Sequence, residues 1–178
     1  MNIIKNPLLN IKTKSEKSVL NLDEVKNYLK IDFSEDDELL SNFIDTAQCQ
    51  CETFINKSLT ERVLVYSLYN YRDTILLPYS PINLIESVIG IGLDGSQEEV
   101  ENYTLDSVGD ILIFNGLKKY YRLDIEYSAG YKTSESIPVD LKQAMLMHIA
   151  RMYEDRTGYS QLPINSMNIY RKYKQIKI

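Results

Sequence analysis

The sequence has 178 residues, of which 44% are hydrophobic and 25% charged, and its formal net charge is −5. This composition is typical of one globular domain, or of a compact domain with an insertion, that can bury enough apolar surface to fold without disulfides or metal. The negative charge argues against a module that grips duplex DNA, because phosphate binding requires clustered Lys and Arg. No apolar run is long enough for a signal peptide or a membrane span, so we expect synthesis in the cytoplasm and no membrane contact.

The first 57 residues predict an arm followed by two helices. Residues 1–20 carry four Lys and one Glu with little periodicity, which indicates a flexible, irregular arm. A short helix is predicted over 22–31, with Asn21 as its N-cap and Glu24 completing a capping box. A longer helix is predicted over 35–56, with Ser34 as its N-cap and four acidic residues in its first turn. Its apolar residues recur at helical spacing.

The next segment, 60–131, is rich in β-branched and aromatic residues and predicts five or six short antiparallel strands. Asp94-Gly95 is a favoured hairpin turn. The clearest strand is 121–128, where apolar residues alternate with polar ones, which predicts one buried face and one solvent-exposed face. The buried set is Tyr121, Leu123, Ile125 and Tyr127.

Helical spacing returns at 138–157, with Pro138 in the first turn and Gly158 just past the end. The residues after it, 161–178, contain four basic side chains and no acid, and predict a basic tail that is either a further short helix or an extended segment. We therefore expect an α+β fold in which helices from both ends of the chain, within 21–57 and 137–160, form a helical bundle, and the antiparallel β-rich region 60–131 is inserted between them.

Few residues suggest chemistry. His148 is the one histidine, but it lies on the apolar stripe of its helix and has no placed partner, so a core role is favoured over catalysis. The acidic run Glu35–Glu38 lacks the spacing of a calcium loop and is explained by the helix dipole. The pair Cys49 and Cys51 is too small a set for zinc; Cys51 falls on the apolar stripe and Cys49 off it. No nucleotide-binding or hydrolase motif is present. We expect no catalytic, cofactor or metal site.

Charge is distributed unevenly. Residues 21–53 hold nine acids and two Lys, a net charge of −7, whereas the last 18 residues are basic. One interpretation is a solvated acidic helix and an ordinary tail. The other is complementarity between copies of the chain, or with another ring, in which basic tails reach acidic helices.

Several segments follow spacings found together in one family. Leu22, Glu24, Lys26 and Leu29 fit L-x-E-x-K-x-x-L, and residues 37–47 fit D-x-x-L-x-x-x-I-x-x-A. LLPYSPINLIESV at 76–88, IEYSAGY at 125–131, IPVDLKQAMLMHIARMYEDR at 137–156 and LPINSMNIYRKY at 162–173 continue the series. In this order the segments resemble the head–tail connector proteins of tailed phages, also called head-completion or adaptor proteins.

The resemblance implies a structural, non-enzymatic protein of the virion head–tail junction, made in the cytoplasm of the bacterial host. Its implied partners are other copies of itself in a ring, the portal protein, a tail-side completion or tail protein, and passing DNA only non-specifically. The predicted partner contacts lie in the tail: Tyr170, Arg171, Lys172, Tyr173, Lys174 and Lys177. Deleting 162–178 is expected to impair association and leave the fold intact.

Two other functions stay open at this stage. The helices at 22–31 and 35–56 could form a helix-turn-helix of a DNA-binding regulator, although the second helix opens with acids that phosphates would repel. The β-rich region could instead bind a ligand, which would require a deep pocket with converging polar groups.

Overall fold

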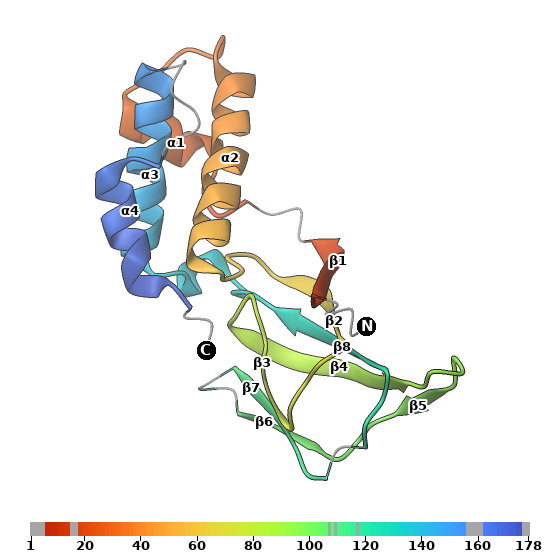
Figure 1. Cartoon of the computed structure of the whole chain (residues 1–178). Coiled ribbons are helices and arrows are strands. Elements are labelled where there is room, and N and C mark those ends of the chain that lie inside the picture. Colours follow the sequence, from red (N-terminus) through yellow and green to blue (C-terminus); the bar gives the residue numbers. More distant parts are fainter. Residues whose placement is uncertain are drawn as a thin grey trace. The chain divides into compact units, whose positions relative to one another are not determined.

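The structure is a computed structural model that describes residues 6–14, 18–106, 108, 110–116, 118–155 and 162–175. It divides into two compact units. The unit that we call the β unit comprises the described residues of 1–15 and 61–130, and the helical unit comprises those of 16–60 and 131–176. Figure 1 shows the elements of each.

The helical unit contains four α-helices and two short 3-10 turns. Their bounds are α1 Leu22–Leu29, α2 Asp37–Ile55, η1 Ser134–Ser136, α3 Val139–Glu154, α4 Ile164–Tyr170 and η2 Arg171–Tyr173. The buried stripes of α2 and α3 meet in its core, as the helical spacing of the apolar residues predicts. Among the described residues, no helix is long and apolar enough to cross a membrane.

The helix starts show how local signals act. At α1 the predicted capping box is confirmed: the Asn21 side chain accepts from the Glu24 N–H at 2.8 Å, and the Glu24 carboxylate accepts from the Asn21 N–H at 2.8 Å. At α2 the predicted N-cap is wrong, because the helix starts at Asp37 with Asp36 as its N-cap. Ser34 lies in the preceding turn, where its carbonyl accepts from the Asp37 N–H at 3.2 Å.

The β unit contains two antiparallel sheets. The strands are β1 Leu8–Lys14, β2 Arg62–Leu68, β3 Thr74–Leu76, β4 Ile82–Ile91, β5 Gln97–Glu99, β6 Tyr103–Asp106, β7 Ile111–Phe114 and β8 Arg122–Ala129. The larger sheet has the order β1-β2-β8-β4-β5 and the smaller one β3-β7-β6. Apolar residues of both sheets form one buried core, which includes Leu64, Leu112, Ile125 and Tyr127.

Two local predictions in this unit are confirmed, one of them with an exception. In β8, Leu123, Ile125 and Tyr127 are fully buried as predicted. The prediction that Tyr121 is buried with them is wrong, because Tyr121 lies just before the strand and is 42% exposed. The turn at Asp94-Gly95 joins β4 to β5, with Gly95 at a φ of 82°, a conformation that glycine adopts without strain.

The predicted fold class, a bundle of terminal helices with an inserted β-rich region, is wrong. The chain is mixed, and its strands are central to the fold: four helices accompany two antiparallel sheets that have a core of their own. The residues of β1, expected in an irregular arm, pair with β2 in the larger sheet, so the sheet does not lie wholly between the helices in sequence. Seven residues without a neighbouring hairpin partner give no local signal for a strand, because the partner strand lies about 50 residues further along.

Candidate partner-binding surfaces

The basic tail predicted from the sequence is a helix and a 3-10 turn docked in the helical unit. Arg171, Lys172 and Lys174 are exposed, and we call these three side chains the basic end. Lys177, the sixth predicted contact residue, lies outside the described residues. The basic end is therefore held in place by folded structure and presents three cations to solvent.

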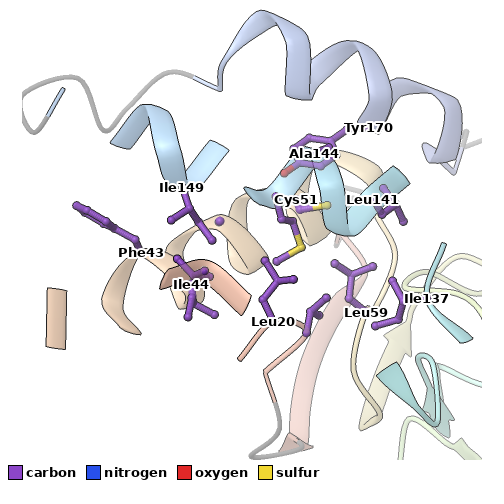
Figure 2. Close-up of a cluster of buried hydrophobic side chains, with 14 of the residues drawn as sticks. Leu20, Phe43, Ile44, Cys51, Leu59, Ile137, Leu141, Ala144, Ile149 and Tyr170 are labelled. Atoms are coloured by element: carbon purple, nitrogen blue, oxygen red, sulfur yellow. The ribbon is translucent and has the colours of Figure 1, made fainter. Parts of the chain in front are cut away.

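Tyr170 does not belong to this surface, in contrast to its prediction as a partner contact. Its side chain is fully buried in the core of the helical unit. Figure 2 shows the Tyr170 ring entering the core from α4, close to Ala144 and Cys51. Its ring also lies 6.3 Å from that of Phe54. Tyr170 thus attaches the basic end to the fold, and deletion of 162–178 would open the core, contrary to the expectation that the fold stays intact.

Three further contacts attach the basic end to the C-terminal end of α2. The Gln175 N–H donates to the Ile55 carbonyl at 2.8 Å, and the Asn56 side-chain amide donates to the Gln175 side-chain carbonyl at 3.1 Å. Lys174 Nζ lies 5.0 Å from the centre of the Phe54 ring, within the range of a cation–π contact. Lys174 therefore lies where the helix dipole of α2 is negative, which stabilises its charge.

Tyr173 is half-buried, and its hydroxyl donates a hydrogen bond to the Asp140 carboxylate. This bond, together with burial and the charge of the carboxylate, raises the pKa of Tyr173 to about 12. Tyr173 is thus largely committed to an internal contact with α3.

The acidic residues separate into an internal set and an exposed set. Asp36 accepts from the Tyr153 hydroxyl at 2.7 Å, Asp37 pairs with Lys26 at 2.7 Å, and the buried Glu52 accepts from the Leu59 N–H at 2.7 Å. The sequence did not reveal these contacts, because their partners lie on other segments. The exposed acids around the start of α2 form a second surface, the acidic end, made of Asp32, Glu35 and Glu38.

The acidic end bears on the helix-turn-helix alternative. In that arrangement the first residues of the second helix approach the bases in the major groove. Here the first turn of α2 exposes Glu38, and the turn before it exposes Glu35. Carboxylates at this position would meet the phosphates of the duplex, so the structure does not favour α1 and α2 as a DNA-reading pair.

Distance keeps the two charged ends apart within one copy. Helix α2 has 19 residues, so its two ends are separated by about 27 Å at 1.5 Å per residue. The Debye length at physiological salt is about 8 Å. The basic end and the acidic end therefore do not neutralise each other inside the chain, and each remains available to a partner.

The remaining candidate residues lie in or beside the core. His148 is 1% exposed on the buried face of α3, and burial lowers its pKa to about 4. Cys51 is buried and Cys49 exposed, as predicted, and burial raises the pKa of the Cys51 thiol. Among the described residues, no three His, Cys, Asp or Glu side chains are grouped so that they could hold a metal ion.

Comparison with solved structures shows the same fold elsewhere. One similar chain comes from a structure described as the neck of an empty GTA particle computed with C6 symmetry, with 21% identity and a TM-score of 0.77. Others come from the virion of a native gene transfer agent (GTA) particle, with 22% identity and a TM-score of 0.79, and from the neck of a native GTA particle computed with C12 symmetry, with 23% identity and a TM-score of 0.78. Each alignment covers 96% of this chain and 97% of the other chain.

A search of curated proteins finds no match. The family model described as head completion protein matches residues 18–161, which is most of the chain. This match confirms the resemblance seen in the ordered sequence segments, and with it a structural protein that connects head and tail. The chain belongs to the head completion protein family.

Proposed function

We propose that this protein is a non-enzymatic component of the virion head–tail junction that assembles as a ring and joins the portal to the tail. The family match carries the proposal. The similar chains from structures described as necks, computed with C6 and C12 symmetry, support a ring at that position. In this proposal the ring surrounds the passage through which DNA moves.

The charges of the helical unit suggest how the junction is held. The basic end is fixed to α2 through Gln175 and Tyr170, so binding a partner costs little additional ordering of these side chains. Its three cations require an acidic counterpart. The acidic end of a neighbouring copy offers one, and an acidic surface on the portal or on a tail-side protein offers another.

The acidic end also suits a ring that lets DNA pass. Exposed carboxylates do not release counterions from DNA, so they do not bind its phosphates. A passage lined by such residues lets the polyanion slide. DNA is accordingly a non-specific passenger of the ring, and the structural partners are proteins.

The test combines charge reversal with a stability control. The double variant Arg171→Glu/Lys172→Glu changes two exposed side chains and leaves Tyr170 and Gln175 in place. The matched control is Arg72→Glu, an exposed cation in the β unit. Each protein is co-expressed with the portal protein from the same genome, and the complex is quantified by affinity co-purification and by light scattering after size exclusion.

We expect the double variant to lose portal or ring association while its thermal unfolding stays within a few degrees of that of the unmodified protein. Raising the salt concentration should weaken association of the unmodified protein, because exposed charge pairs are screened. Association that survives the double variant at full strength would contradict a role for the basic end. Failure of the unmodified protein to bind portal or to form a ring, together with tight duplex-DNA binding in a gel shift at moderate salt, would contradict the proposed function.

A further inference from the structure

The larger sheet of the β unit has two open edges among the described residues. Strand β1 pairs with β2 alone, and β5 pairs with β4 alone. An edge strand presents backbone N–H and C=O groups that no neighbour satisfies, and it can pair with a strand of another chain. The two edges differ in chemistry, and this difference indicates how they can be used.

The β1 edge is apolar and basic. Ile11 lies opposite Leu64 and so faces the core side of the sheet, yet Ile11 is 55% exposed whereas Leu64 is fully buried. The cause is position, because no described strand beyond β1 covers Ile11. Leu8 is also 55% exposed, on the opposite face. Lys12 adds a cation whose side chain is 58% exposed although it pairs with Glu126.

The β5 edge is acidic. All three of its residues, Gln97, Glu98 and Glu99, are exposed. Glu98 pairs with Lys118 at 2.8 Å, and the exposed Glu101 follows two residues after the strand. The hairpin between β4 and β5 exposes an apolar side chain, that of Leu93, which is 86% exposed.

We propose that β1 of one copy lies beside β5 of the next copy, so that the larger sheet continues from copy to copy. The occupant of each edge is thus a second copy of this chain. The inference rests on the proposed function, because a ring requires two different surfaces that meet head to tail. A basic edge with exposed Leu8 and Ile11 meets an acidic edge beside Leu93, so charge and apolar surface are both complementary.

Strand direction is compatible with this arrangement. Each neighbouring pair across the larger sheet is antiparallel, so after four steps β1 and β5 run in the same direction. Copies related by rotation about an axis along the strands would then bring β1 and β5 together as parallel neighbours. Contact between two β5 edges would instead oppose carboxylates, which is unfavourable.

Cysteine cross-linking tests the contact in the full chain. In a Cys49→Ser background, Asn10→Cys marks β1 and Glu99→Cys marks β5; both positions are exposed and project from the same face of the sheet. The buried Cys51 is retained. Rings formed alone or with portal are treated with a short bis-maleimide, and the products are separated under denaturing conditions.

The double-cysteine variant should give a ladder of dimers, trimers and larger species, because every copy contributes both edges. Each single variant should stay monomeric, and an equimolar mixture of the two should give dimers only. Homodimers from Asn10→Cys alone, or a ring that gives no ladder, would overturn this inference and leave the proposed function standing. A chain that remains monomeric with and without portal would overturn both.

Charge exchange supplies a second measurement. Lys12→Glu should weaken ring association by about two- to fivefold, the effect of one opposed cross-strand pair. Because this change also removes the ion pair with Glu126 inside the copy, thermal unfolding of the variant is measured beside its association. Adding Glu99→Lys should restore ring association, whereas the control Arg72→Glu should leave it unchanged. Equal weakening by Lys12→Glu and by Arg72→Glu would count against β1 as a contact edge.

Discussion

Replacing Tyr170 by Ala should destabilise the helical unit strongly, whereas replacing it by Phe should not. The ring of Tyr170 is fully buried beside Cys51 and Phe54, so truncation to Ala removes a large aromatic side chain from a packed core. Such truncations cost about 3–5 kcal/mol. That is a large share of the about 5–15 kcal/mol that stabilises a typical domain.

The Phe variant isolates the hydroxyl. The Tyr170 hydroxyl is buried with the Cys51 thiol as its neighbour, and a thiol is a weak hydrogen-bonding partner. Removing a poorly satisfied buried polar group costs little, so Tyr170→Phe should remain within about 1 kcal/mol of the unmodified protein. The comparison therefore separates loss of packing from loss of a hydrogen bond.

Urea unfolding followed by far-ultraviolet circular dichroism at 222 nm reports on the helices. The midpoint for Tyr170→Ala should fall by about 2 M, given a slope of about 2 kcal/mol per molar urea. A chain ending at residue 161 should lose at least as much, because it also removes the buried Ser166 and the contacts of Tyr173. If Tyr170→Ala or the truncated chain unfolds within about 1 kcal/mol of the unmodified protein, α4 is not part of the core and the reasoning fails.

Three further outcomes follow from buried or capped groups. His148 stays neutral in the folded protein down to about pH 4, whereas in the unfolded chain it takes up a proton below about pH 6.5. The free energy of unfolding should therefore be at its full value above pH 6.5 and decline by up to about 3 kcal/mol as the pH falls to 4. His148→Met should reduce this decline, which pH-dependent urea unfolding can measure; equal declines would refute the assignment. Asn21→Ala should cost about 1 kcal/mol in the same urea assay through loss of the α1 cap, and no change would show that the cap is dispensable. Maleimide should label Cys49 rapidly and Cys51 only on unfolding, as followed by mass spectrometry, and equal labelling rates would contradict the burial of Cys51.

The features that the sequence predicted correctly are local ones. The Asn21 cap, the apolar stripes of α2 and α3, the alternation in β8 and the turn at Asp94-Gly95 each depend on residues within a few positions of one another. Over such spans the backbone geometry relates sequence spacing directly to a face of a helix or strand. The ordered segments in turn identified the family, because they preserve that spacing along most of the chain.

The errors concern contacts between distant segments. The position of β1 depends on β2, about 50 residues away, and the burial of Tyr170 depends on Cys51 and Phe54, which lie more than 110 residues earlier. Periodicity describes which side of an element is apolar, but it does not say which other element covers it. The sequence by itself therefore determined α1, α2, α3, the strand β8, the distribution of charge and the family. Only the tertiary structure decided that residues 8–14 pair in the larger sheet, that the basic end is docked on the helical unit, and that the acidic end lies one helix length away from it. These features depend on which surfaces meet when the chain folds.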